Sequence, residues 1–244
     1  MRTVSKTELG TTTLDRQNNR IGRPTTSAEA DERWGSLKKT PIRNRLLSQQ
    51  YFLCAMTEFN IDEFKSKADS KHGCHLEHIK PRSKFPELTF EYENIVISVL
   101  DDLDQRKFKQ DFFIGEEAEE DLSHQLWFGA KAKDDELDEA LFISPTEQDC
   151  QRYFVYIEHS GEIKPANGLE GDEVKRAEYT IKLLNLNHPY LKNQRYKRMK
   201  EVLDDIEELD DLDEQIDIVR AEISEHNGQI ASFPSAVQSL VSGT

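Results

Sequence analysis

The sequence has few cysteines and no long apolar segment. Its 244 residues contain three cysteines, Cys54, Cys74 and Cys150, an odd number at wide spacings, which argues against a disulfide framework. No apolar run approaches the roughly 20 residues that a transmembrane helix requires. The first residues, MRTVSKTELGTTTLDRQ, lack the apolar core of a secretory signal. These absences predict a cytoplasmic protein with no membrane partner.

Basic residues are a minority, and they are unevenly placed. The chain has 32 Lys and Arg against 47 Asp and Glu, for a net charge of -15. This balance is unfavourable for a nucleic-acid enzyme, because phosphate binding gains from cationic side chains. However, residues 175–200 carry eight Lys and Arg, whereas 201–217 carry ten acids and no base. A basic surface beside an acidic helix suits a nucleic acid plus a protein partner, and a solvated acidic face is the alternative.

Hydrophobic periodicity and turn residues predict an α+β fold that is mainly helical. Four parts are expected: a flexible basic arm (1–40), a folded domain (41–200), an acidic helical extension (201–227) and a flexible tail (228–244). The apolar spacing predicts the folded elements in order. They are a helix from Pro41 to about Gln50, a strand over Cys74–Ile79, a small β-hairpin over 154–163, a helix over Glu173–Leu186 and a long helix from Tyr190 to Asp217 or Ile223.

The long C-terminal helix has a weak seven-residue repeat. Val202, Leu209, Ile216 and Ile223 recur every seven residues, which is the spacing of a coiled coil. Three heptads are few, so a helix that docks on its own domain is the competing interpretation.

The stretch from Cys74 to Asn94 carries the candidate chemistry. It contains His75-Leu76-Glu77-His78, and Asn94 lies sixteen residues after His78. Neighbouring residues on a strand face opposite sides, so Glu77 and His78 would point apart while His75 shares the face of Glu77. This pattern resembles the first two parts of an HNH nuclease, the ββα-metal finger.

That resemblance implies a metal-dependent phosphodiester hydrolase. His78 would be the general base, Glu77 a metal ligand and His75 a second ligand. Asn94 would bridge backbone groups of the loop and orient His78, although an Asx-type turn would use the same residue. A carboxylate after Asn94 would complete a Mg²⁺ or Mn²⁺ site, and the nearest candidates are Asp101, Asp102 and Asp104.

Two other interpretations of the same residues stay open. The histidines could be surface polar residues of an ordinary strand. They could also belong to a structural Zn²⁺ site with Cys54 and Cys74. Cys54, Cys74 and His75 supply three ligands, and the sequence shows no obvious fourth.

Further blocks resemble the Septu and retron-associated HNH endonucleases, the PtuB-type family. The similarity runs in order from about residue 43 to 200. Its blocks are Arg45 to Thr57, Cys74 to Pro81, Tyr92 to Asn94, Phe128 to Lys131, Phe142 to Pro145 with Asp149, Cys150 and Phe154, and Thr180 to Asn187 before Leu191 and Arg195. The sequence departs from the family at Thr57, Phe128 and Ala130, where Cys or His ligands are expected, which weakens the case for zinc.

The family resemblance implies an effector nuclease of bacterial anti-phage defence. Such proteins act with an SMC-like or ABC-type ATPase (PtuA-type) and, in retrons, with a reverse transcriptase and its RNA–DNA product. The substrate would be DNA or RNA, including tRNA. A catalytically degenerate scaffold that binds the ATPase is the alternative. We expect a nucleic-acid or partner surface at Lys192, Arg195, Lys197 and Arg198.

Overall fold

The computed structural model describes residues 1–6, 12–64, 74–99 and 127–241. Within them the protein has helices and two separate two-stranded antiparallel sheets, so the expected α+β class is confirmed. No helix in this described part is long and apolar enough to cross a membrane.

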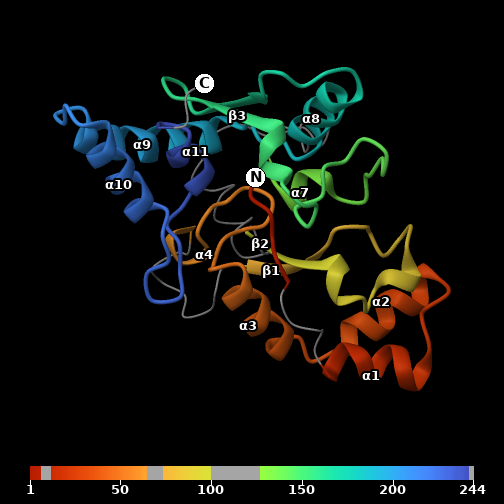
Figure 1. The fold of residues 1–244 in the computed structure, drawn as a ribbon. Helices are drawn as coiled ribbons and strands as arrows, with labels where there is room; N and C mark the ends of the chain where they lie inside the picture. The colour runs from red at the N-terminus through yellow and green to blue at the C-terminus, as the bar shows by residue number, and fades with distance from the viewer. Residues whose placement is uncertain (7–11, 65–73, 100–126, 242–244) are drawn as a thin grey trace, which may run out of the picture.

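Helices come before, between and after the two hairpins along the chain (Figure 1). The described elements are α1 (Thr12–Ile21), α2 (Ser27–Ser36), α3 (Thr40–Gln49), α4 (Ile61–Phe64), β1 (Cys74–His78), η1 (Pro86–Leu88), η2 (Tyr92–Asn94), β2 (Ile95–Val99), α7 (Ala130–Lys133), η4 (Cys150–Tyr153), β3 (Phe154–Ile157), β4 (Glu162–Pro165), α8 (Asp172–Leu183), α9 (Pro189–Ile206), α10 (Leu212–Glu222) and α11 (Pro234–Gln238).

The hairpin β1–β2 lies at the centre of the molecule. Its register pairs Cys74 with Val99 and His78 with Ile95. All five residues of β2 are buried, and four of them are β-branched, which suits a strand enclosed on both faces. The buried side chain of Gln50, just after α3, hydrogen-bonds both the N–H and the C=O of Ile97. The helical segment before the hairpin is therefore fixed to β2.

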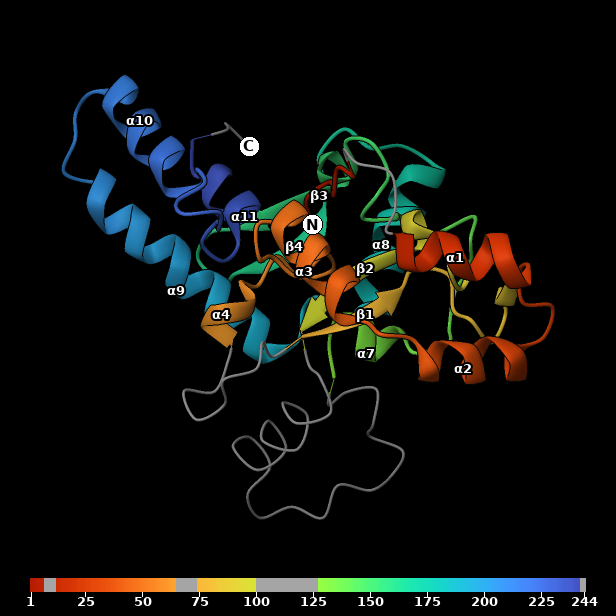
Figure 2. The same ribbon diagram turned by 90° about the horizontal axis from the view of Figure 1, so that it is seen from below.

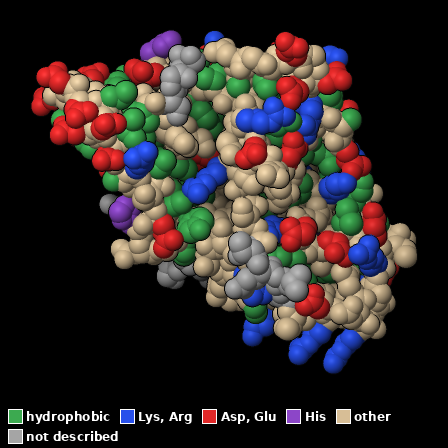
Figure 3. Space-filling view, in the orientation of Figure 1, with side chains coloured by type: hydrophobic (Ala, Val, Ile, Leu, Met, Phe, Trp, Pro, Cys, Tyr) green, Lys and Arg blue, Asp and Glu red, His purple; other side chains and the backbone are tan. Residues whose placement is uncertain are grey.

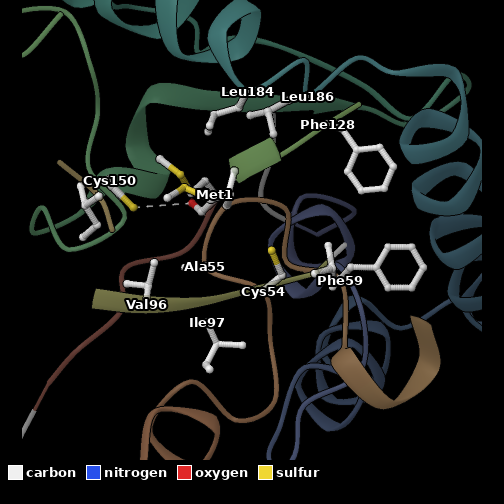
Figure 4. Packing of buried hydrophobic residues seen from close by; sticks show 14 of the residues in the cluster. Met1, Cys54, Ala55, Phe59, Val96, Ile97, Phe128, Cys150, Leu184 and Leu186 are labelled. Atoms are coloured by element: carbon white, nitrogen blue, oxygen red, sulfur yellow. Dashed lines mark hydrogen bonds between the residues drawn. The ribbon is translucent and has the colours of Figure 1, made fainter. Parts of the chain in front are cut away.

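One hydrophobic core joins segments from both ends of the chain. It includes Leu14 and Trp34 near the N-terminus, Ile97 of β2, Phe128, and Phe233 near the C-terminus. Figure 4 shows Cys54, Ala55 and Phe59 of the loop before α4 packed between Val96 and Ile97 on one side and Phe128, Leu184 and Leu186 on the other. The predicted hairpin at 154–163 and the helices at 41–50 and 173–186 are confirmed.

The prediction that residues 1–40 form a flexible arm is wrong for the described part. Residues 12–21 and 27–36 are helices that lie beside the β1–β2 hairpin (Figure 2). Thr26 caps α2 by accepting a hydrogen bond from the N–H of Glu29, and the Glu29 carboxylate accepts one from the N–H of Thr25, in the manner of a capping box. Few apolar residues mark these helices, but Trp34 alone buries a large surface.

The long C-terminal helix is two helices. Helix α9 ends at Ile206, and α10 begins at Leu212 after Asp211, whose side chain caps it by accepting from the N–H of Asp213. The two helices fold against each other, and Val202, Ile206 and Val219 form a small core of their own. Of the four positions that suggested a coiled coil, Val202 and Ile223 pack in this small core, as the interpretation of a helix docked on its own domain expected.

The prediction of a flexible tail over 228–244 is also wrong for its described part. Ile230 and Phe233 are buried, and α11 begins directly after Phe233. The side chain of Asn60 donates to the carbonyl of Ile230, and the Glu58 carboxylate accepts from the N–H and hydroxyl of Ser235. The C-terminal segment is therefore part of the folded core.

Ile230→Val tests whether the C-terminal segment contributes to stability. Ile230 is 3% exposed, and removing one buried methyl group costs about 1 kcal/mol of unfolding free energy. The matched control is Ile21→Val, because Ile21 is 63% exposed and should change stability by less than about 0.5 kcal/mol. Urea denaturation measures both. Equal midpoints for the two variants would contradict a docked C-terminus.

Candidate active site at the end of strand β1

Strand β1 presents two different faces. Cys74, Leu76 and His78 are buried, whereas His75 and Glu77 are half-buried. Glu77 and His78 therefore point to opposite sides at the end of the strand, as the sequence predicts, and His75 shares the face of Glu77.

The tautomer of His78 follows from its hydrogen bonds. Its Nε2 lies 2.9 Å from the carbonyl oxygen of Thr89, and a carbonyl can only accept, so Nε2 carries the proton. Nδ1 is then the nitrogen with the lone pair. It lies 3.1 Å from Nη1 of Arg82, which donates to it. The nitrogen that would take a proton from water is therefore covered by a guanidinium in this structure.

The imidazole of His78 is buried under α2. It is 4% exposed, and the ring of Trp34 meets it edge to face with 4.4 Å between centroids. Burial and the positive charge of Arg82 together lower the pKa of His78 to about 4, against the opposing effects of the Thr89 carbonyl and Glu77. His78 is therefore neutral at pH 7, the state that a general base needs.

The depressed pKa of His78 predicts a pH dependence of stability. The unfolded chain has an ordinary histidine pKa near 6.5, so between that pH and about 4 the unfolded state binds the extra proton and the folded state does not. The free energy of unfolding should therefore fall as the pH drops through this window. His78→Asn should flatten the profile measured by urea denaturation, whereas the exposed His159→Ala should leave it unchanged. Equal pH profiles for the wild type and His78→Asn would contradict a buried neutral imidazole.

Asn94 makes the backbone contacts that the sequence analysis expected of it. Its Oδ1 accepts from the N–H of Lys80 at 2.8 Å, and its Nδ2 donates to the carbonyls of Lys80 and Leu88 at 3.1 and 3.2 Å. These bonds tie both ends of the loop between β1 and β2. The same loop carries Thr89, so Asn94 fixes the segment that holds the His78 ring.

Glu77 lies between two groups that stabilise its charge. Its Oε2 is 3.5 Å from Nε2 of His75, and its Oε1 is 3.1 Å from Nζ of Lys133 on α7. Burial raises the pKa of Glu77, but the hydrogen bond from His75 and the charge of Lys133 outweigh it and hold the pKa below its ordinary value. Glu77 is therefore a carboxylate at neutral pH.

His75 and Glu77 suit a divalent cation in donor type. An imidazole and a carboxylate converge on one face, and Nδ1 of His75 is buried without a hydrogen-bond partner in the structure. Among residues 1–6, 12–64, 74–99 and 127–241, however, no three His, Cys, Asp or Glu side chains are placed to hold a metal ion. Asp101, Asp102 and Asp104 lie outside the described residues.

The described residues do not assemble the alternative zinc site. Cys54 lies 3.5 Å from the hydroxyl of Ser98, and Cys74 is buried in the core. Around Cys54, the positions expected to carry further ligands are packed instead. A Cβ on Gly129, which has φ +64°, would meet the Thr57 methyl at 3.1 Å, and Phe128 is fully buried.

Only part of the basic surface expected on α9 is exposed. Arg195 is 1% exposed and donates to the carbonyl of Leu186, so the prediction that it lies outside is wrong. Burial lowers its pKa to about 10. Arg198 is half-buried and pairs with Glu222 and Glu201. Lys197 is exposed and Lys192 is half-buried.

The sequence analysis missed three side chains that contact the site: Trp34, Arg82 and Lys133. Arg82 lies four residues after His78, and this short spacing was the one available signal. Trp34 lies 44 residues before His78, and Lys133 lies 56 residues after Glu77. Without a fold, nothing in the sequence connects them to β1.

Comparison with known proteins gives one informative similarity. No family model matches the chain. A curated protein from Vibrio cholerae serotype O1 biovar El Tor, named "Retron Vc95 putative HNH endonuclease", is 28% identical over 170 residues. The match covers 68% of this chain and 66% of the relative, just under two thirds of its length. This similarity supports a link between the chain and the HNH endonucleases.

Proposed function

We propose that this protein is a metal-dependent HNH nuclease of a retron-type defence system that hydrolyses phosphodiester bonds in DNA or RNA. The observation that carries the proposal is the β1–loop–β2 arrangement. Strand β1 ends with Glu77 and His78, whose side chains point to opposite faces. Asn94 then fixes the loop that follows the strand. The name of the Vibrio relative supports the same chemistry and the retron context.

His78 is the proposed general base. Thr89 holds the ring in the tautomer with the lone pair on Nδ1, and that nitrogen would accept a proton from the attacking water. Asn94 acts as a positioning residue, because it holds the loop that carries Thr89. The neutral state of His78 at pH 7 means that no prior deprotonation is needed.

Glu77 and His75 are the proposed ligands of Mg²⁺ or Mn²⁺, with Asp101, Asp102 or Asp104 as the candidates to complete the set. A hard divalent ion suits the carboxylate donors, and when bound it polarises the phosphate and stabilises the leaving oxyanion. The ammonium of Lys133 lies 3.1 Å from Oε1 of Glu77, which leaves Oε2, on the side of His75, as the oxygen available to the ion.

A catalytically degenerate scaffold is the second candidate. One observation favours it: Arg82 covers Nδ1 of His78 while Lys133 neutralises Glu77, so both proposed catalytic groups are already partnered within the chain. The nuclease requires Arg82 to move away from Nδ1 of His78, whereas the scaffold requires no such movement.

The partners are part of the proposal. By resemblance, an SMC-like or ABC-type ATPase of the PtuA type would hold the nuclease, together with a reverse transcriptase and its RNA–DNA product in a retron. The α9–α10 hairpin offers an acidic surface for such a protein, because residues 201–222 carry eleven acids against one base.

The proposal is tested by a cleavage assay on mixed DNA and RNA. The purified chain, alone and with co-expressed retron components, is incubated with duplex DNA, single-stranded DNA and tRNA in Mg²⁺, in Mn²⁺ and in EDTA. The nuclease predicts cleavage that EDTA stops. Absence of cleavage under every condition, with the complex assembled, would favour the scaffold.

A further inference from the structure

Three cationic side chains, Lys39, Arg43 and Arg82, lie near one another, and Arg82 contacts His78. Lys39 immediately precedes α3 and Arg43 lies one turn later on the same face, with its N–H bonded to the Lys39 carbonyl at 2.9 Å. Arg82 comes from the loop after β1. Lys39 Nζ and Arg82 Cζ both lie over the ring of Trp34, at 5.3 and 5.5 Å from its centroid. Trp34 thus holds two of the cations next to the imidazole that it also covers.

This cluster has more positive charge than its neighbours balance. Arg82 pairs with Asp31 at 3.0 Å, but within the described residues no ion pair is found for Lys39 or Arg43. The Nε of Arg43 is buried without a hydrogen-bond partner. Burial lowers the pKa of Lys39, and the charges of Arg82 and Arg43 lower it further. Like charges held this close repel one another, and an anion between them would relieve the repulsion.

The surrounding surface has the same sign. Residues 12–49 carry eight Lys and Arg against four Asp and Glu, in a chain whose net charge is -15. Figure 3 shows Lys and Arg side chains at the lower edge of the molecule, near α1 and α3, and Asp and Glu gathered over α10 at the opposite end. Helix α3 also has no acid in its first turn and Lys39 at its N-cap, where the helix dipole favours negative charge.

We propose that Lys39, Arg43 and Arg82 form a binding site for the phosphate backbone of a nucleic acid, next to His78. The inference rests on the proposed nuclease and names how its substrate is held. Planar guanidinium groups bind phosphate oxygens with two parallel hydrogen bonds. A phosphate that takes the guanidinium of Arg82 also removes it from Nδ1 of His78 and frees that lone pair for a water proton.

Binding without cleavage tests the site. Fluorescein-labelled duplex DNA and single-stranded RNA of about 20 nucleotides are titrated with the full chain in EDTA over a series of salt concentrations, and anisotropy gives the affinity. Lys39→Ala/Arg43→Ala should weaken binding by about tenfold or more at low salt and reduce the slope of log K against log salt by about 1–2. The matched control is Arg152→Ala/Lys164→Ala, which removes two exposed cations elsewhere on the chain and should leave binding near the wild-type level.

The outcomes separate this inference from the nuclease. Wild-type affinity and slope in Lys39→Ala/Arg43→Ala would overturn the site. An equal loss of binding in Arg152→Ala/Lys164→Ala, or a wild type that binds neither oligonucleotide, would overturn it as well. Thermal melting by circular dichroism shows whether each variant is folded. A chain that binds through the cluster but never cleaves would refute the nuclease and leave the phosphate site standing.

Discussion

Replacing His78 by alanine is expected to reduce cleavage by about 10²–10⁴-fold, the usual contribution of a general base. The physical reason is that alanine removes the Nδ1 lone pair that would accept the water proton. In the wild type, Thr89 keeps this lone pair on Nδ1 because its carbonyl accepts a hydrogen bond from Nε2–H. The measurement is the initial rate on whichever nucleic acid the wild type cuts, at saturating Mg²⁺ or Mn²⁺. His78→Asn is the companion variant, because it keeps a polar side chain at this position but offers no basic nitrogen.

His159→Ala is the matched control for His78→Ala. His159 is exposed in the turn between β3 and β4, away from β1, so its loss should leave the rate unchanged. Because His78 is buried, urea denaturation must accompany the rates. A folded His78→Asn that cleaves as fast as the wild type would remove His78 from the mechanism and favour the scaffold.

Glu77→Gln is expected to lower the free energy of unfolding by about 3 kcal/mol, because it leaves a buried ammonium without its counter-charge. Lys133 is 0% exposed, and its Nζ has Glu77 and the carbonyl of Asp134 as recorded partners. Lys133→Met should cost less, about 1–2 kcal/mol, because solvent reaches the half-buried Glu77 carboxylate. Urea denaturation at pH 7 measures both.

The double variant Glu77→Gln/Lys133→Met isolates the interaction. Since removing both charges leaves no unpaired ion, the double variant should lose clearly less than the sum of the two single losses. Glu139→Gln is the control. Glu139 pairs with Lys80, but both side chains are exposed, so the loss should stay under about 1 kcal/mol. Equal losses for Glu77→Gln and Glu139→Gln would show that the Glu77–Lys133 pair is not buried in solution.

The two sets of variants address different properties. His78 is expected to matter for the rate, whereas Glu77 is expected to matter for both stability and rate, because it serves as the partner of Lys133 and as the proposed metal ligand. A scaffold would show the stability loss in Glu77→Gln with no cleavage to lose. The combination therefore decides between the nuclease and the degenerate protein.

The local pattern around β1 was readable from the sequence. Alternation in His75-Leu76-Glu77-His78 predicted two faces, and the resemblance to the HNH finger predicted that the Asn94 amide ties the loop. Both are short-range features, set by strand geometry and by hydrogen bonds within a hairpin of about 25 residues. The helices at 41–50 and 173–186 were equally accessible, because one face of each carries most of its apolar residues.

The ends of the chain were misjudged because neither carries a long helical or strand pattern. Segment 12–36 has few apolar residues and segment 228–241 forms only the short helix α11, yet Trp34 and Phe233 lie in the common core and Ile230 is buried. The break between α9 and α10 was missed because the heptad positions continue through it, while the cap at Asp211 depends on a single side chain.

The sequence by itself determined the chemistry available at β1: a carboxylate, an imidazole and a bridging amide, placed by strand alternation and hairpin length. Only the tertiary structure decided the state of these groups. It buries His78 under Trp34, covers its lone pair with Arg82 and pairs Glu77 with Lys133. Trp34 and Lys133 come from distant segments, and burial and charge pairing depend on which segments meet in space, which spacing along one strand cannot specify.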